Sequence, residues 1–195
     1  MRHFVKELTG ADKVIMYAPI VRQATATQGA EAQPPAGDVH VDFNTTQASL
    51  VASALLPPED KDYKYTRFLH LSNWRAFSPG PQDWPLGVVN SRSVRDDEGL
   101  VNTAIYQNEP PPEDLENLPD IPEGTRTGDA FVFPYNGNFE WNYFSCMTRD
   151  EVLSFKLNDS DHERTWRTPH CSFKNDGEGC QPRESIEIRA CCYFK

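Results

Sequence analysis

Long apolar runs are missing from the sequence. No stretch approaches the roughly 18 apolar residues that a membrane-spanning helix needs, and the first residues, MRHFVKELTGADK, lack the apolar core of a signal peptide. We therefore expect a cytoplasmic protein that does not enter a membrane. The chain has 195 residues, 38% of them hydrophobic, which is enough for a substantial core, and we expect a single domain over residues 1–195.

Positive charge is also scarce. The sequence has 19 Lys and Arg residues against 29 Asp and Glu residues, which gives a formal net charge of −10. Nucleic-acid binding depends on basic residues that neutralise phosphates and release their counterions. The composition therefore argues against DNA or RNA as a partner.

Cysteine occurs five times but never in the C-x-x-C spacing that is typical of structural zinc sites. An odd number of cysteines also disfavours a disulfide framework, so we expect reduced thiols. The adjacent Cys191 and Cys192 point to opposite faces of a strand and are interpreted as small core residues.

Helical periodicity is limited to residues 45–56, which begin with Thr45 as a candidate N-cap and end before two prolines. Elsewhere, runs rich in β-branched and aromatic residues are separated by turn residues, and they predict eight to ten short strands. The clearest of these cover residues 14–17, 39–43, 65–74, 85–94, 102–107, 130–133, 139–144, 152–157 and 186–194. This pattern predicts an all-β dominated fold, either a sandwich or a closed jelly roll, with few short helices.

Three local patterns give further expectations. Asn136-Gly137 predicts a hairpin between the strands on either side of it. Thr148 and Glu151 have the spacing of a capping box and predict a single helical turn. Residues 108–129 form a long acidic, proline-rich connection, which we interpret as a lid or a disordered segment.

Two histidines and an aspartate form a candidate metal site. His40 and Asp42 occupy alternate positions of one predicted strand, so both side chains point to the same face. His170 lies near the end of the strand series. Two imidazoles and one carboxylate bind one face of Fe(II) and leave positions open for a co-substrate and dioxygen. The alternative is an ordinary β-rich protein whose histidines are satisfied by hydrogen bonds, as we expect for His70.

Arg183 follows His170 by thirteen positions and shares a strand face with Ser185. A guanidinium fork and a hydroxyl are suited to binding a carboxylate. Arg75 ends a predicted strand on its more aliphatic face and needs a carboxylate partner from the protein or from a ligand. Tyr143 belongs to an aromatic group on alternating strand positions that either lines a pocket for an apolar metabolite or forms ordinary core; the others are Phe131, Phe133 and Trp141.

Seven segments carry a family resemblance. They are TGADKVIMYAPIVR, VHVDF, NWRAF, WPLGVVNSRSV, MTRDEVLSFKLNDSD, TPHCSF and PRESIEIRA, in this order. They resemble the fungal hydroxylase/desaturase family that includes the aspergillic acid hydroxylase/desaturase, gibberellin desaturase and cephem-methoxylase accessory proteins. The resemblance implies a double-stranded β-helix of the cupin-like, jelly-roll kind. The segment ahead of the first strand is short relative to that family, so we expect either a shortened protein or a pocket completed by a partner subunit.

The resemblance also implies functional residues. His40, Asp42 and His170 would hold iron, and Arg183 and Ser185 would bind the far carboxylate of 2-oxoglutarate. Arg75 would line the site and contact the substrate, as would Tyr143 if its aromatic group lines a pocket.

The function expected from these residues is that of a non-haem Fe(II)/2-oxoglutarate-dependent oxygenase, a hydroxylase or desaturase that uses dioxygen on a small specialised metabolite. Two alternatives stay open. One is a metal-dependent, non-oxidative isomerase or cyclase, and the other is a non-catalytic partner protein of a biosynthetic complex. A homodimer is compatible with each of them.

Overall fold

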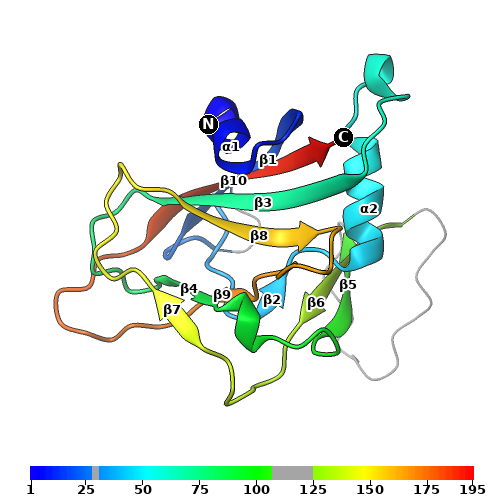
Figure 1. Ribbon diagram of the computed structural model, residues 1–195. Helices are drawn as coiled ribbons and strands as arrows, with labels where there is room; N and C mark the ends of the chain where they lie inside the picture. Colours follow the sequence, from blue (N-terminus) through cyan, green and yellow to red (C-terminus); the bar gives the residue numbers. More distant parts are fainter. Residues whose placement is uncertain (28–30, 107–124) are drawn as a thin grey trace.

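The computed structural model describes residues 1–27, 31–106 and 125–195. Within these residues two antiparallel sheets face each other, one above the other in Figure 1. The four-stranded sheet has the order β1 (Lys13–Gln23), β10 (Glu184–Phe194), β3 (Arg67–Ala76) and β8 (Leu153–Asp159). The six-stranded sheet has the order β5 (Leu100–Tyr106), β6 (Arg126–Val132), β2 (His40–Val41), β9 (His170–Ser172), β4 (Leu86–Val89) and β7 (Trp141–Tyr143).

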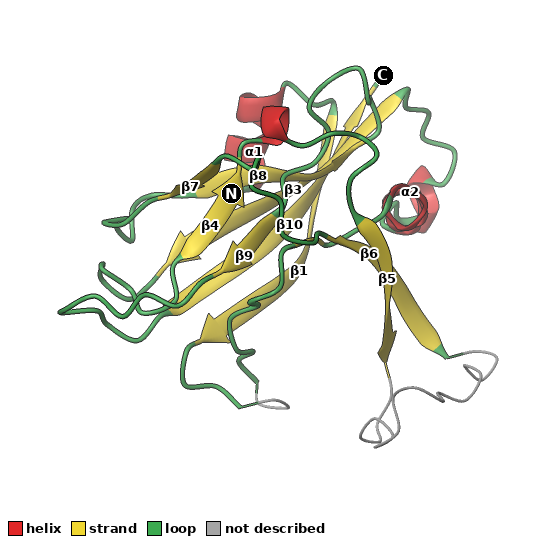
Figure 2. Cartoon of the chain, turned by 90° about the horizontal axis from the view of Figure 1, so that it is seen from below, coloured by secondary structure: helices red, strands yellow, loops and turns green. Residues whose placement is uncertain are grey.

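The chain passes repeatedly from one sheet to the other. It does so from β2 to β3 to β4, and again from β7 through β8 and β9 to β10. This alternation produces the double-stranded jelly roll that the sequence predicts. Figure 2 shows the paired strands β5 and β6 extending away from the remaining strands.

A hydrophobic core fills the space between the sheets. Strand alternation turns Phe68 and Trp74 of β3, Phe155 of β8 and Tyr193 of β10 into this space. The helix α2 (Thr45–Ala54) closes one end of the sandwich in Figure 1. Its backbone is fixed to the core because the Tyr193 hydroxyl donates a hydrogen bond of 2.7 Å to the Ala52 carbonyl.

A second core lies on the outer face of the four-stranded sheet. The helix α1 (Arg2–Thr9) covers this face and buries Val5 completely. Leu69, Leu71 and Cys192 pack in this outer core, whereas Cys191 belongs to the inner one. The prediction that the two adjacent cysteines are core residues on opposite faces is therefore confirmed.

Several local expectations are wrong. Strand β6 pairs with β2 and β5, and β7 pairs with β4, so Asn136-Gly137 does not join a hairpin. Glu151 does accept hydrogen bonds from the Thr148 amide and hydroxyl, but no helical turn follows. The α2 cap is Asn44, one residue earlier than expected, and its side chain accepts a 2.7 Å bond from the Gln47 amide.

Several short helices and one long connection also differ from the sequence-based expectation. The helix α1 is missing from the sequence-based expectation, because so short a helix depends on packing rather than on propensity. Two 3-10 helices, η1 (Pro58–Asp60) and η2 (Ser91–Ser93), follow α2 and β4. The end of the predicted 108–129 connection is part of β6, and the rest of it, residues 108–124, to which the lid interpretation applies, lies outside the described residues. Among the described helices, none has the length and apolar character needed to cross a membrane.

A buried carboxylate ties β8 to β3. Asp159, whose side chain is fully buried, accepts bonds of 2.8 and 2.7 Å from the Arg67 guanidinium and one of 2.7 Å from Lys156 Nζ. Burial alone would raise the pKa of Asp159, but these hydrogen bonds hold it below its ordinary value. A carboxyl group with a lowered pKa stabilises the fold above its unfolded-state pKa.

We expect Asp159→Asn to lower the free energy of unfolding by about 2 kcal/mol at neutral pH, because charge-assisted hydrogen bonds are lost. The difference in unfolding free energy between wild type and variant should shrink as the pH falls below about 4, because the carboxyl group of the unfolded chain then binds a proton. The carboxyl group of the folded protein binds its proton at a lower pH. Urea titrations at pH 7 and pH 3 measure both effects. Asp97→Asn is the control, since Asp97 pairs with Arg95 on the exposed surface. Equal losses of unfolding free energy in Asp159→Asn and Asp97→Asn would contradict the stabilising role of Asp159.

Candidate metal centre

The register of the six-stranded sheet brings the two histidines together. His40 of β2 pairs directly with His170 of β9, which in turn pairs with Val88 of β4. Paired residues share a sheet face, so both imidazoles point into the space between the sheets. Their ring centroids lie 4.4 Å apart. Strand β2 ends at Val41, and the chain then turns toward α2 with Asp42 beside His40.

His40, Asp42 and His170 each offer a ligand atom, and these atoms all lie within 4.8 Å of one another. His40 Nε2 is 3.5 Å from Asp42 Oδ1. Adjacent ligands with metal bonds of about 2.1 Å stand roughly 3 Å apart. Small side-chain rotations are therefore enough to bring the three atoms around one ion.

The backbone fixes both imidazoles in the same way. His40 Nδ1 lies 2.7 Å from the Asp38 carbonyl, and His170 Nδ1 lies 3.1 Å from the Thr168 carbonyl. In each case the carbonyl lies two residues earlier in the chain and accepts the Nδ1 proton. This leaves Nε2 with its lone pair available, which is the arrangement that metal-binding histidines adopt.

Electrostatics prepares the three groups for a cation. Burial and the neighbouring His40 lower the pKa of His170 to about 3, so this ring is neutral at neutral pH. Burial lowers the pKa of His40, but the hydrogen bond and charge of Asp42 raise it above its ordinary value overall. Burial raises the pKa of Asp42, and the Arg189 guanidinium and His40 outweigh this and hold it well below its usual range. The carboxylate therefore stays charged.

Arg189 holds the carboxylate from the opposite sheet. Its Nη2 lies 3.2 Å from Asp42 Oδ2, and its Nε donates a 3.0 Å bond to Glu187 Oε1. Asp42 Oδ2 is buried, and no group of the described residues donates to it in hydrogen-bond geometry. A charged carboxylate next to two imidazoles that are held through their Nδ1 atoms fits the ligand set of Fe(II).

A second charged group lies in the same cavity. The Arg183 side chain is almost completely buried, and its Nε donates a 3.0 Å bond to Ser185 Oγ. Its Nη1 donates to the Trp84 carbonyl at 3.0 Å and to the Ser172 hydroxyl. Burial lowers the pKa of Arg183 to about 10, so the guanidinium remains charged at neutral pH. No carboxylate of the described residues pairs with this guanidinium.

The cavity joins the two groups. His40, His170 and Arg183 line it together with residues that the sequence did not indicate: Arg22, Ala36, Trp74, Leu86, Phe155, Cys171, Ser172 and Glu187. The indole Nε1 of Trp74 is buried and has no hydrogen-bond partner among the described residues, and Arg183 lies over the indole ring at 5.2 Å. Strand alternation groups Trp74 with His70 but does not by itself show that this face lines the cavity.

Arg75 lies outside this cavity. It occupies the face of β3 opposite Trp74, where its Nε donates to the Arg149 carbonyl and its Nη2 lies 3.8 Å from Asp150. The protein itself thus supplies the partner that Arg75 needs.

Tyr143 is also outside the cavity. It pairs with Gly87, one residue out of step with Val88 and His170, so it faces away from the metal cluster and packs against Phe173. Of the other aromatic residues, Phe131 and Phe133 contact each other, and Arg167 lies over both rings.

The other histidines have different environments. His70 is buried and satisfied, because Nδ1 lies 2.8 Å from the Tyr17 hydroxyl and Nε2 lies 3.0 Å from the Ala48 carbonyl. His162 is exposed and stacks on Trp166. Neither approaches His40, so neither competes for the metal.

A family model described as "Oxidoreductase/YMDC permease-like domain" matches residues 1–193. The chain belongs to this family. The Fe(II)/2-oxoglutarate-dependent dioxygenase nvfI of Aspergillus novofumigatus (strain IBT 16806) is 31% identical over 193 residues, which cover 97% of this chain and 63% of that relative. The hydroxylase/desaturase efuI of Hormonema carpetanum is 30% identical over 209 residues, which cover 98% of this chain and 67% of the relative.

A solved structure supports the same relationship. The iron and alpha-ketoglutarate-dependent endoperoxidase NvfI matches with a TM-score of 0.78 at 28% sequence identity, covering 98% of this chain and 66% of the other. The predicted fungal hydroxylase/desaturase resemblance and the jelly-roll fold are therefore confirmed. The chain spans about two thirds of the length of these relatives.

We expect His170→Ala to weaken binding of Co(II), a spectroscopic substitute for Fe(II), by at least about 100-fold. Removal of a group that only hydrogen-bonds to a metal ligand already lowers metal affinity by up to about 100-fold, and removal of the ligand itself should cost at least as much. Absorption titration and calorimetry measure the affinity. His162→Ala is the matched control and should bind like the wild type. Retention of tight binding in His170→Ala would exclude this ligand set.

Proposed function

We propose that this chain acts as a non-haem Fe(II)/2-oxoglutarate-dependent oxygenase that hydroxylates or desaturates a small specialised metabolite. The observation that carries the proposal is one cavity lined both by the two histidines of the His40, Asp42 and His170 cluster and by a buried Arg183 that has no carboxylate partner among the described residues. The names of the relatives, which include Fe(II)/2-oxoglutarate dependence and hydroxylase/desaturase activity, support it.

In this proposal His40, Asp42 and His170 hold the iron. The chemistry that Fe(II) and 2-oxoglutarate would supply when bound is the activation of dioxygen, which is the oxidant, with 2-oxoglutarate as the two-electron co-reductant that becomes succinate and carbon dioxide; the result is removal of hydrogen from an unactivated carbon. The protein keeps His170 neutral and Asp42 ionised, so both are ready to bind a cation without a change of protonation. His40 loses its proton to the solvent if it is protonated before binding, which makes metal uptake dependent on pH.

Arg183 and Ser185 bind the far carboxylate of 2-oxoglutarate. The guanidinium is fixed by three hydrogen bonds to Ser185, Trp84 and Ser172, so little side-chain freedom is lost when an anion binds. Its burial weakens competition from water, and charge-assisted bonds in such surroundings are worth about twice those between neutral groups. The unpaired Trp74 Nε1–H is a further donor that a carboxylate oxygen would satisfy.

The walls of the cavity exclude water. Leu86, Trp74 and Phe155 are buried, and the Phe155 ring lies 4.7 Å from the His170 ring. An apolar wall beside the metal strengthens the electrostatic interactions inside and protects a reactive centre from side reactions.

We expect the wild type to develop a visible charge-transfer band when 2-oxoglutarate is added to the Fe(II) form without oxygen, and to form succinate when air is admitted. Arg183→Lys keeps a charge but loses the guanidinium fork, so the affinity for 2-oxoglutarate should fall at least about tenfold, equivalent to about 1.4 kcal/mol. Co(II) affinity should stay unchanged.

The control is Arg75→Gln, which should leave 2-oxoglutarate affinity unchanged because Arg75 lies outside the cavity. Metal binding without either the band or succinate would reject the oxygenase proposal and favour non-oxidative chemistry.

A homodimer in the cytoplasm remains part of the proposal. The edge strand β5 exposes 60% of Leu100 and of Val101 and 42% of Ile105, which supports association of two copies because exposed apolar edge strands pair readily.

A further inference from the structure

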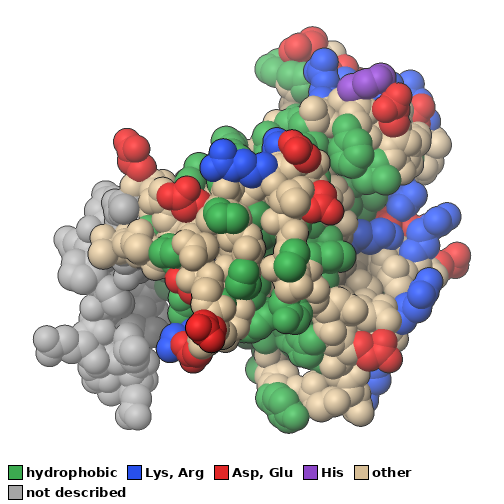
Figure 3. Space-filling model, turned by 90° about the vertical axis from the view of Figure 1, so that its left-hand side faces the viewer, with side chains coloured by type: hydrophobic (Ala, Val, Ile, Leu, Met, Phe, Trp, Pro, Cys, Tyr) green, Lys and Arg blue, Asp and Glu red, His purple; other side chains and the backbone are tan. Residues whose placement is uncertain are grey.

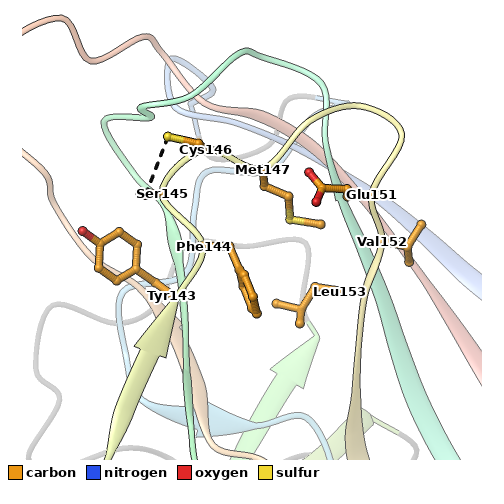
Figure 4. A pocket seen from close by; sticks show the side chains of 8 residues that line it. All are labelled: Tyr143, Phe144, Ser145, Cys146, Met147, Glu151, Val152 and Leu153. Carbon is orange, nitrogen blue, oxygen red and sulfur yellow. Dashed lines mark hydrogen bonds between the residues drawn. The ribbon is translucent and has the colours of Figure 1, made fainter.

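A recess separate from the metal cavity lies where the chain crosses from β7 to β8. It has a volume of about 410 Å³ and is lined by Tyr143, Phe144, Ser145, Cys146, Met147, Glu151, Val152 and Leu153. In Figure 4 the side chains of Phe144, Met147 and Leu153 point toward one another across it, whereas Tyr143 points away. Pockets of roughly 300–1,000 Å³ bind small ligands.

Apolar surface is exposed around this recess. Phe144 is 58% exposed and Trp141, on the adjacent strand β7, is 44% exposed. Figure 3 looks at the side of the molecule on which β7 lies in Figure 1 and shows hydrophobic side chains gathered across the middle of that face. Covering apolar groups that are open to water lowers the free energy of the complex.

The loop that forms the recess is fixed on both sides. Arg149 Nε donates a 2.6 Å bond to the Phe77 carbonyl, and Arg75 donates to the Arg149 carbonyl. Close to Gly80 the backbone packs so tightly that a Cβ atom there would lie 2.5 Å from the Ser145 carbonyl oxygen. The recess is therefore preformed rather than created by a ligand. Arg75 contributes to it from outside the metal cavity.

Strand β8 connects the recess with the metal cavity, because Leu153 lines the recess and Phe155 lines the cavity. Leu153 begins β8 and pairs with Trp74, which lines the metal cavity. Phe155 follows two residues later, about 7 Å along the strand, and its ring lies 4.7 Å from the His170 ring. A molecule with one end on Leu153 thus needs a length of about 12 Å or less to reach the ligand His170.

The charge of the recess defines the ligand further. Glu151 Oε2 accepts both bonds from Thr148, whose amide and hydroxyl lie 2.7 and 3.0 Å away, and these bonds hold the pKa of Glu151 below its ordinary value. No hydrogen bond to Oε1 is found among the described residues. The recess therefore presents the apolar side chains of Phe144, Met147 and Leu153 beside polar groups and one charged acceptor, a combination that disfavours anions and suits a neutral compound with a hydroxyl donor.

We propose that this recess binds the apolar body of the metabolite substrate, a neutral ring compound that carries a donor group for Glu151, and directs its other end along β8 toward the metal. This inference rests on the oxygenase function proposed above. It separates the two ligands: the charged co-substrate lies on Arg183, and the apolar substrate enters from the Phe144 side.

The exposed thiol of Cys146 at the recess gives a direct test. The protein is equilibrated with three small disulfides under reversible exchange, one bearing a naphthyl group, one a neutral polar group of similar size and one a carboxylate. Mass spectrometry of peptides measures capture at Cys146. We expect the naphthyl group to be captured at least about tenfold more than the polar one, equivalent to about 1.4 kcal/mol, and the carboxylate least.

Cys180, which is partly exposed in the loop before Arg183, is the internal control and should show no such preference. Phe144→Ser and Leu153→Gln should each remove the naphthyl preference at Cys146. Two independent variants are used so that the test still stands if one of them misfolds. Absence of a naphthyl preference in a protein that still forms the Fe(II)/2-oxoglutarate band overturns the recess as the substrate site and leaves the proposed function intact. A preference in a protein that forms no band overturns the inference together with the function on which it rests.

Discussion

The ion pair between Asp42 and Arg189 connects the metal cluster to the opposite sheet. Asp42 follows β2 of the six-stranded sheet, whereas Arg189 belongs to β10 of the four-stranded sheet, and their charged groups lie 3.2 Å apart in the interior. Removing one partner of a buried pair typically costs about 3–5 kcal/mol, because the other charge is left without compensation. The carboxylate ligand is therefore in place only when the two sheets are packed together.

Strand β10 positions both parts of the candidate site. Its inward positions alternate through Ser185, Glu187 and Arg189, and Arg183 precedes the strand by one residue. The same strand thus carries the guanidinium that holds the Asp42 carboxylate and the hydroxyl that supports the Arg183 guanidinium. A shift of β10 by one residue would turn all of these side chains to the outer core beneath α1. The two parts of the candidate site are consequently positioned by one register.

The parts of the site that the sequence predicted depend on simple alternation. His40 and Asp42 lie close together as their spacing indicates, and Arg183 and Ser185 share a face and a hydrogen bond. Pairing of His40 with His170 requires a contact between distant strands, which the candidate metal set implied but strand alternation alone could not indicate. The jelly roll itself was predictable because the strands are short, numerous and separated by turn residues.

The errors have a common physical cause. Strand β3 is buried on both faces, by the other sheet and by α1, so its composition does not reveal which face lines the cavity. The family resemblance suggested Arg75 as a residue that lines the site, and in the structure Trp74 is the residue of β3 that lines the metal cavity. Asn136-Gly137 failed as a hairpin signal because β6 and β7 are held by other partners in the six-stranded sheet. In both cases tertiary pairing outweighed local preference.

The direct pairing of β2 with β9 also has a consequence for biosynthesis of the protein. His40 and His170 occupy adjacent strands although more than a hundred residues separate them in the chain. Contacts between such distant segments form slowly, because a long loop must close before they gain any energy. During translation the first histidine leaves the ribosome long before the second, and Arg189 of β10 follows the second histidine. The candidate metal cluster is thus assembled only after β9 and β10 have been made, so a chain that ends before them has no assembled site in which iron could react with oxygen.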